Sequence, residues 1–349
     1  MVDFAGWSMP VQYDGLMKEH ERVRRRVGLF DVSHMGELFF RGAGALETLD
    51  LLATQHVATL RDQQALYTPL CNQDGGVLDD VLVYRVDARR FMMVVNAANV
   101  DKIARWSKQH LAPDTELEDA SDRVALLAVQ GPRSRDVLQR VHALGAWASQ
   151  LERLEYYHFL GDGQGDILFL SRTGYTGELG YEIYVRPDHA VRLWDEIVAA
   201  GEAFDLGPAG LGARDTLRFE VGFCLYGHEL DEDVSPLEAG LGWTVKLDKG
   251  HFLGRSALAE QKERGVPRRL IGLATQERAI ARAGYPVQSG GRAVGAVTSG
   301  TFSPTLQRSL AMALVEREVP DESWSVVVRG RDVPMRRVRL PFHKPSPAP

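Results

Sequence analysis

The stretch "GGVLDDVLVYRVDARRFMMVVNAAN", residues 75–99, contains two runs of β-forming residues separated by a short reversal. We expect "VLVYRV" (81–86) and "RFMMVV" (90–95) to pair as a hairpin, because Val, Tyr and Phe favour strands and "DAR" has a suitable length for the loop. Residues equally far from the middle of "DAR" then lie opposite one another, so that Asp80 faces Asn96. A shift of one residue would turn the side chain to the other face of the sheet.

Two adjacent acids, Asp79 and Asp80, stand at the start of this hairpin, and they have two interpretations. Glycine and aspartate are ordinary turn-forming residues, in which case the pair serves only the turn. Alternatively, a carboxylate and an amide whose Cβ atoms are ~4.5–5.5 Å apart would share one small spot on the sheet. The hairpin alone leaves both interpretations open.

Composition and charge are those of a globular protein, and they argue against several classes of function. The chain has 349 residues, 44% hydrophobic and 25% charged, which is enough for about two or three domains. A net charge of −6 gives no field that would attract nucleic acid. No stretch reaches the ~20 apolar residues of a membrane span, and the N-terminus lacks the profile of a signal peptide. We therefore expect a cytoplasmic protein.

The cysteines, histidines and glycines form none of the common cofactor patterns. Cys71 and Cys224 are isolated and the histidines are scattered, so we expect free thiols, a reducing compartment and no metal site. The glycines of "GYTGELGYE" (174–182) lie between two strands, where no phosphate cradle is expected. Tyr175 and Glu182 in this segment could bind a nitrogen heterocycle, although both residue types are common in exposed loops.

Apolar periodicity predicts the elements along the rest of the chain. Helices are expected over residues 15–27, 44–54, 99–110, 131–144, 188–201 and 207–223. The last of these, and the one at 131, are expected to start at Gly-Pro. A strand–loop–strand unit is expected over 166–185. After about residue 265, short strands divided by Gly, Ser and Pro are typical of a barrel or sandwich.

Some single side chains have an ordinary structural interpretation beside a functional one. Ser33 and His34 are neighbours, but a nucleophile and its base are partnered in space rather than in sequence, so we expect His34 to be a satisfied turn or core residue. Arg214 lies in the first turns of an expected helix, where nearby acids could hold it in a salt bridge. Trp243 lies on an alternating stretch that predicts a strand, where an aromatic residue is usually part of the core.

Several segments, read together, resemble one family. They are, in chain order, "VDFAGWSMPVQY", "FDVSHMGE", "GGVLDD", "VVNAAN", "GYTGELGYE", "GPAGLGARDTLRFEVGFCLYGHEL", "SPLEAGLGWTV" and "GAVTSGTFSPTL". From residue 2 to about residue 340 they are similar to the T-proteins of the glycine cleavage system, a family of aminomethyltransferases. Other folate-dependent relatives share parts of these motifs. Members of the T-protein family usually carry further residues before "VDFAGW", so we expect this chain to start late relative to them.

The resemblance implies an α+β fold in which three domains form a cloverleaf around a central folate channel. Mixed α/β domains come first: residues 1–265 would be the folate-binding region, made of two interleaved domains, with the second centred on about 45–140. A C-terminal all-β barrel would follow over 266–343. Residues 344–349 are expected to be a disordered tail.

The resemblance also implies an activity. The substrate would be an aminomethyl group on the lipoyl arm of the H-protein, with the P- and L-proteins in the same pathway. Tetrahydrofolate, the co-substrate, would accept the one-carbon unit as methylenetetrahydrofolate, with release of ammonia and the dihydrolipoyl arm. No metal, nucleic acid or membrane is expected to take part, and a monomer is expected. Two alternatives stay open: a folate-dependent demethylase acting on an O-, N- or S-methyl donor, and a folate-binding protein without catalysis.

The family's functional positions are carried over residue by residue. The essential acid matches Asp80. The folate contacts and pocket walls match Met35, Tyr67, Val94, Asn96, Tyr175, Glu182, Arg214 and Trp243, and Arg282 lies near a further basic position. Within this set the resemblance implies that Tyr175 and Glu182 line and bind the pterin.

Asp80 suits the chemistry that the resemblance implies. Expulsion of ammonia leaves positive charge on the reacting carbon, and an aspartate with an ordinary pKa of ~3.9 is ionised at neutral pH unless burial raises that pKa strongly. The carboxylate can stabilise the positive charge, or it can transfer a proton at the folate nitrogen. The sequence leaves both roles open.

Overall fold

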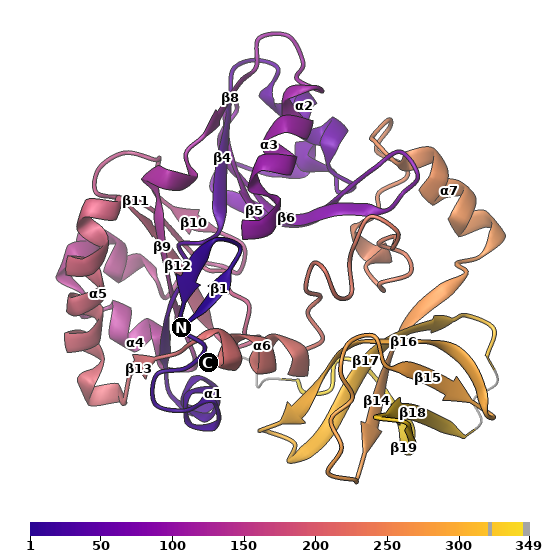
Figure 1. Ribbon diagram of the computed structural model, residues 1–349. Helices are drawn as coiled ribbons and strands as arrows, with labels where there is room; N and C mark the ends of the chain where they lie inside the picture. Colours follow the sequence, from indigo (N-terminus) through magenta and orange to yellow (C-terminus); the bar gives the residue numbers. More distant parts are fainter. Residues whose placement is uncertain (320–322, 345–349) are drawn as a thin grey trace.

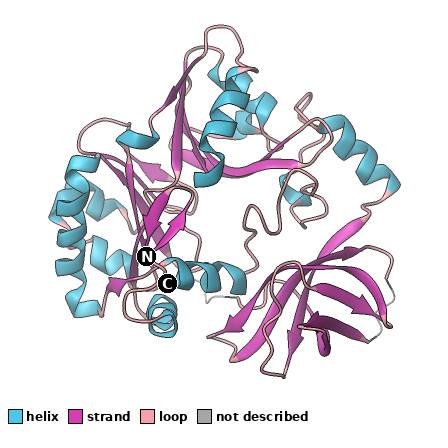
Figure 2. Cartoon of the chain, viewed as in Figure 1, coloured by secondary structure: helices cyan, strands magenta, loops and turns pink. Residues whose placement is uncertain are grey.

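The computed structural model describes residues 1–319 and 323–344, and these form three lobes (Figure 1). Two lobes are each built on one open sheet that is accompanied by helices (Figure 2), and the third is a closed six-stranded barrel. The structure thus confirms the predicted α+β fold with a C-terminal all-β barrel. Of the tail predicted over 344–349, residues 345–349 lie outside the described residues.

The first lobe, at the top of Figure 1, is a five-stranded sheet in the order β5-β6-β7-β4-β8. Its strands are β4 (Gly36–Arg41), β5 (Gln64–Cys71), β6 (Val77–Asp87), β7 (Arg90–Val95) and β8 (Glu116–Asp119). The accompanying helices are α2 (Ala45–Leu52), α3 (Val100–Lys108) and the 3-10 turns η1 (Val57–Thr59), η2 (Ala97–Asn99) and η3 (Ser121–Arg123). Leu49 of α2 and Ile103 of α3 are buried against one face of the sheet, which fixes these helices there.

The second lobe is a six-stranded sheet in the order β10-β11-β12-β9-β3-β13. Its strands are β3 (Gly28–Asp31), β9 (Ala125–Gln130), β10 (Phe159–Leu160), β11 (Ile167–Ser171), β12 (Gly180–Val185) and β13 (Gly207–Pro208). The helices of this lobe are α1 (Leu16–Arg25), α4 (Ser134–Leu138), η4 (His142–Gln150), α5 (Pro187–Gly201), η5 (Glu202–Phe204) and α6 (Leu211–Glu220). A hairpin of β1 (Val2–Phe4) and β2 (Trp7–Met9) precedes them.

The third lobe is the barrel, in the order β14-β17-β16-β15-β18-β19. Its strands are β14 (Arg268–Thr275), β15 (Pro286–Ser289), β16 (Arg292–Ser303), β17 (Arg308–Glu316), β18 (Trp324–Val328) and β19 (Arg331–Val338). The turn η6 (Gly242–Thr244) and the helix α7 (Arg255–Arg264) lie on the segment that leads into it. Residues of α6 and of this segment bind the barrel: Arg218 Nη2 donates to Ser299 Oγ at 3.0 Å, and Thr298 Oγ1 donates to Glu229 Oε1 at 2.6 Å.

The two open sheets pack face to face, and a core lies between them. The buried cluster that joins them includes Tyr84, Met92 and Val94 of the first sheet and Ala128, Phe169 and Tyr184 of the second. Val23 of α1 and Leu217 of α6 belong to the same cluster and close one side of it. Side chains on the facing surfaces of both sheets can therefore meet at one site.

The hairpin register is the predicted one from Arg85 outward, whereas a shift between Arg85 and Asp87 leaves Asp87 opposite Arg90 beside the turn. β6 and β7 pair antiparallel with Leu82 opposite Val94. In this register Asp80 and Asn96, each two residues beyond that pair, reach one another, and Asn96 Nδ2 donates to Asp80 Oδ1 at 2.9 Å. The predicted meeting of the acid and the amide at one spot is therefore confirmed.

Four local predictions differ from the structure. The helix expected over 131–144 is the short α4 followed by the separate turn η4, because Val141 between them is extended and buried. The helix expected from residue 207 begins at Leu211, since Gly207–Pro208 pairs with β3 as a short parallel strand. The strand β15 was not predicted, because four residues that begin with proline give a weak strand signal. Trp243 lies in η6 and is 58% exposed, not in a strand of the core.

Candidate active site

One face of the five-stranded sheet carries the predicted acid and two of the predicted pocket walls. Tyr67 on β5 lies opposite Leu82 on β6, and Leu82 lies opposite Val94 on β7. Residues two apart on a strand point to the same face, so Asp80 shares the face of Leu82 and lies diagonal to Tyr67. The sheet thereby brings a phenol and a carboxylate from neighbouring strands together.

The Asp80 carboxylate has a hydrogen-bond partner on each oxygen. Tyr67 OH donates to Oδ2 at 3.0 Å, and Asn96 Nδ2 donates to Oδ1 at 2.9 Å. The same amide nitrogen also donates to Asp79 Oδ1 at 2.7 Å. We call Tyr67, Asp79, Asp80 and Asn96 the central polar cluster. Its hydrogen bonds hold the carboxylate of Asp80 in one orientation.

Asp79 points to the opposite face and is fully buried. Its Oδ1 accepts a hydrogen bond from Asn99 Nδ2 at 2.7 Å, and its Oδ2 accepts one from the backbone N–H of Asn96 at 3.0 Å. These bonds fix the backbone where β7 ends and η2 begins. Asp79 thus positions Asn96, which in turn holds Asp80.

Burial and hydrogen bonding act against each other on the two acids. Burial raises the pKa of Asp80, and the hydrogen bonds from Tyr67 and Asn96 offset only part of this increase. Burial also raises the pKa of Asp79, and the charge of Asp80 raises it further. Both carboxylates therefore ionise at a higher pH than exposed aspartates do.

Arg214, Tyr175 and Glu182 form a second group of predicted site residues. The guanidinium of Arg214, on α6, lies 4.6 Å from the centroid of the Tyr175 ring. Glu182, on β12, is almost buried, and one of its oxygens accepts a hydrogen bond from Thr173 Oγ1. Burial lowers the pKa of Arg214 and raises that of Glu182, and the opposite charge of each residue partly offsets the effect on the other.

Tyr175 connects this second group to the central polar cluster. Burial raises the pKa of Tyr175, and the nearby charge of Asp80 adds to the increase. The Tyr175 OH donates to the backbone oxygen of Cys224, and its ring stacks on Phe223 with centroids 5.8 Å apart. Asp80, Tyr175 and Arg214, from three separate segments of the chain, therefore surround one region.

The salt bridge expected for Arg214 does not form, and His34 is not fully satisfied. Among the described residues, the Arg214 side chain has no hydrogen bond or ion pair, and the acids Asp215 and Glu229 are bound by Arg218 at 2.7 and 2.9 Å. His34 is buried as predicted, but its Nδ1 has no partner in that part of the chain. Burial, together with the charge of Arg214, lowers the pKa of His34 to about 3. A neutral imidazole and an unpaired guanidinium are therefore left for a ligand.

Three further predicted residues are Trp243, Met35 and Arg282. Trp243 stacks on Tyr67, with ring centroids 6.1 Å apart and an interplanar angle of 27°, so it adjoins the central polar cluster. Met35 is half-buried against the core between the sheets. Arg282 is exposed on the loop between β14 and β15, and no described contact joins it to the cluster, so its role stays a prediction.

Sequence reasoning did not single out Asn99 or the pairing of Arg218 with Glu229. Asn99 could have been found, because it follows Asn96 by three positions at a strand end, where one helical turn brings both amides to the same side. The Arg218–Glu229 pair spans a loop, and no local spacing predicts which arginine of α6 takes the acid.

Metal-ligand clusters and membrane spans are both absent from the described ranges. Within residues 1–319 and 323–344, no three His, Cys, Asp or Glu side chains are arranged to hold a metal ion. No helix in the same ranges has the length and apolar character needed to cross a bilayer. Cys71 and Cys224 are free and buried.

Fold and site together define the class of protein: it has two lobes of mixed α/β structure, a barrel, and a half-buried, hydrogen-bonded carboxylate, Asp80, at the candidate site. Two family models match the chain, the GCVT N-terminal domain over residues 1–249 and the Glycine cleavage T-protein C-terminal barrel domain over residues 268–344. The chain therefore belongs to the glycine cleavage T-protein family.

Similar proteins are aligned over nearly the full chain. The aminomethyltransferase of Halothermothrix orenii is 48% identical over 345 residues, which are 98% of this chain and 95% of the relative. The aminomethyltransferase of Bacillus subtilis is 45% identical over 348 residues, 98% of this chain and 95% of the relative. The crystal structure of the glycine cleavage system aminomethyltransferase T from Bartonella henselae is similar with a TM-score of 0.90 at 33% identity, covering 99% of this chain and 94% of that one.

Proposed function

We propose that this protein is an aminomethyltransferase that passes the one-carbon unit of an aminomethyl group on lipoylated H-protein to tetrahydrofolate. The products are methylenetetrahydrofolate, ammonia and dihydrolipoyl H-protein. Membership of the T-protein family supports the reaction, since relatives that align over nearly the whole chain are named aminomethyltransferases. The observation that carries the proposal is the half-buried Asp80 carboxylate, held by Tyr67 and Asn96 near the Tyr175 side chain.

The residues at the candidate site suit tetrahydrofolate. A pterin has N–H donors along one edge, which the second oxygen of Glu182 could accept, and a flat face, which the ring of Tyr175 could cover. Arg214 and His34 carry polar atoms that no described residue binds, and they could meet the polar atoms of the same ring. Buried polar groups are nearly always paired in native proteins, so the unpaired Nδ1 of the buried His34, close to the charge of Arg214, supports a ligand site.

Asp80 would supply the electrostatic part of the reaction. When bound, tetrahydrofolate supplies the nitrogen that accepts the one-carbon unit. The Asp80 carboxylate places a fixed negative charge in a poorly solvated position, where it stabilises positive charge that arises as ammonia leaves. The hydrogen bonds from Tyr67 and Asn96 favour the charged form and keep it oriented. Proton transfer between Asp80 and the folate nitrogen is a second role that this geometry allows.

We also propose the domain division predicted from the sequence, with residues 1–265 as the folate-binding region and 266–343 as the barrel domain. The folate-contact and wall roles of the site residues belong to the same proposal. The P- and L-proteins as pathway partners, a monomeric state, a cytoplasmic location and the lack of a metal requirement stay predictions.

The direct test combines the purified protein with tetrahydrofolate and aminomethylated H-protein. The proposal expects methylenetetrahydrofolate and ammonia in equal amounts. Turnover with an O-, N- or S-methyl donor, and none with the H-protein, would identify a demethylase and overturn the proposal. Saturable folate binding without either reaction would identify a non-catalytic folate-binding protein.

A further inference from the structure

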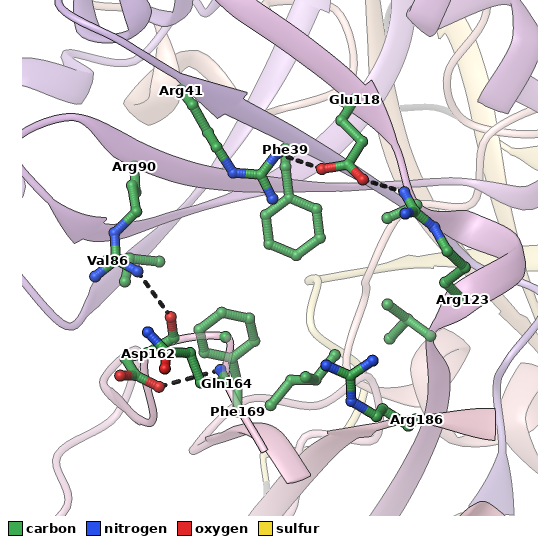
Figure 3. Close-up of a pocket in the computed structure, with 14 residues that line it drawn as sticks. Phe39, Arg41, Val86, Arg90, Glu118, Arg123, Asp162, Gln164, Phe169 and Arg186 are labelled. Carbon is green, nitrogen blue, oxygen red and sulfur yellow. Dashed lines mark hydrogen bonds and ion pairs between the residues drawn. The ribbon is translucent and has the colours of Figure 1, made fainter. Parts of the chain in front are cut away.

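A cavity of about 300 Å³ lies at the seam between the two open sheets (Figure 3). β4, β8 and the end of the β6–β7 hairpin border it on one side, and residues 162–164 with β11 border it on the other. Val86 lines the cavity at one end of β6, whereas Asp80 lies six positions earlier, which at ~3.3 Å per residue is about 20 Å away. The cavity is therefore separate from the central polar cluster.

Arginines dominate the charge of this cavity. Its charged lining residues are Arg41, Arg90, Arg123, Arg186, Glu118 and Asp162. Asp87, just outside the lining, binds Arg90 at 2.6 Å. With Asp87 included, the cavity has four arginines and three acids and therefore a net charge of +1. The net charge of the whole chain is −6. The cavity is thus a local positive region on an acidic protein, which favours an anion.

Two of the guanidinium groups are anchored by the protein and keep donors for a ligand. Arg186 Nε donates to Gly165 O at 2.8 Å, and no described residue binds its two terminal nitrogens. Arg90 donates from Nε to Asp87 and from Nη1 to Asp162 O at 3.1 Å. Its Nη2 has no hydrogen-bond partner among the described residues and can donate to a ligand. Figure 3 shows these two arginines on opposite sides of the cavity. Anchored guanidinium groups lose little freedom when an anion binds.

The other two arginines share one acid. Arg41 and Arg123 each bind one oxygen of Glu118, and Figure 3 shows this trio across one wall. The hydrogen bond from Arg41, followed by that from Arg123, holds the pKa of Glu118 below its ordinary value. Two guanidinium groups on one carboxylate leave the trio with one positive charge.

An apolar surface adjoins these charges. Phe39 stacks with Phe169, with ring centroids 6.4 Å apart and an interplanar angle of 27°, and the Arg41 guanidinium lies 5.1 Å from the Phe39 centroid. Val86 and Leu168 extend this surface. Apolar walls exclude water and strengthen an ion pair formed against them. A ligand with a flat or apolar body and a negative group at each end would match both features.

We propose that this arginine cleft is a second ligand site, separate from the central polar cluster, for a small molecule with at least two phosphate or carboxylate groups on a short flat or apolar body. One anionic group would meet Arg90 and the other Arg186. The cavity has the volume of a small-molecule pocket, whereas a protein partner would need a broad face. The proposal does not depend on the aminomethyltransferase reaction.

Isothermal titration of the full chain tests this proposal with two probes that share a benzene ring, resorcinol bisphosphate for phosphate and isophthalate for carboxylate. At least one probe should saturate with a dissociation constant below about 1 mM. The double variant Arg90→Gln with Arg186→Gln should weaken that binding about tenfold or more, as expected for lost charge-assisted hydrogen bonds. Arg292→Gln with Arg331→Gln removes two charges from exposed ion pairs of the barrel and should leave the affinity unchanged. Arg214→Gln, in the candidate active site, should also leave it unchanged.

Each alternative outcome decides the question. Failure of both probes to saturate at millimolar concentration, equal loss in the barrel variant, or loss in Arg214→Gln would overturn the proposal. The stronger probe identifies the anionic group. If melting curves show that the double variant does not fold, Arg186→Gln alone should still weaken binding about threefold, because one bond to a loop carbonyl is its only described side-chain contact. If neither small anion binds and the double variant Arg90→Gln with Arg186→Gln associates more weakly with the H-protein, the cleft is a docking face and the proposal is overturned.

Discussion

Replacing Asp80 by asparagine removes one negative charge and keeps the shape of the side chain. The amide oxygen can still accept from Asn96 Nδ2, and the new NH₂ can donate to Tyr67 OH, so the hairpin should fold as before. A unit charge about 4 Å from a developing positive charge contributes ~4 kcal/mol at an effective dielectric constant of ~20. That energy corresponds to a loss of ~10³-fold in turnover, and loss of one electrostatic stabiliser in other enzymes gives ~10²–10³-fold.

The assay for Asp80→Asn is a single turnover with aminomethylated H-protein and tetrahydrofolate, followed by ammonia release. Folate affinity, measured separately by calorimetry, should change little, because the lost charge acts mainly in the transition state. Asp74→Asn is a matched control, since Asp74 is an exposed acid of the turn before β6. A rate within about threefold of the unmodified protein, with folate affinity intact, would refute the electrostatic role of Asp80.

Tyr67, Glu182 and Lys249 each make a contact whose loss can be measured. The Tyr67 hydroxyl stabilises ionised Asp80, so Tyr67→Phe should raise the pKa of Asp80. The acid limb of the pH–rate profile should then move to higher pH, and an unchanged acid limb would contradict this prediction. Glu182→Ala should weaken folate binding by about tenfold in a calorimetric titration, because a buried acceptor is lost, and unaltered affinity would remove it from the folate site. The buried ammonium of Lys249 donates to three backbone oxygens. Lys249→Met should therefore lower the free energy of unfolding, measured by urea titration, by about 3 kcal/mol. Lys262→Met, on the exposed face of α7, is the control and should lower that free energy by less than about 0.5 kcal/mol.

The hairpin at residues 75–99 could be predicted because its signals are local. Alternating β-forming residues define the strands, and a short reversal leaves few possible registers. The contact between Asp80 and Asn96 follows from centring the reversal on Ala88, and the structure confirms the contact. The register shift between Arg85 and Asp87, beside the turn, was not predicted. Short elements without a strong pattern, such as β15, could not be found in this way.

The arrangement around Arg214 could not be predicted from spacing. The acids near Arg214 in sequence favour a salt bridge, but Arg218 takes Asp215 and Glu229 because a loop brings Glu229 back to that side of α6. His34 lies close enough to feel the charge of Arg214 because α6 shares a core cluster with Phe30 and Val32, and no local pattern encodes that packing. Trp243 likewise lies in a turn and stacks on Tyr67, a contact between distant segments that local spacing does not encode.

The two adjacent acids, Asp79 and Asp80, are linked by one amide, because Asn96 Nδ2 donates a hydrogen bond to each. A strand turns neighbouring side chains to opposite faces, so only one of Asp79 and Asp80 can point toward Tyr67. Burial and the charge of Asp80 raise the pKa of Asp79, and three N–H donors from Asn96 and Asn99 to the Asp79 carboxylate lower it. No described Lys or Arg forms an ion pair with either acid, although a cation there would offset the charge more strongly. A cation would also cancel the field of Asp80 at the reacting carbon, whereas neutral amides stabilise the buried charge and leave that field in place.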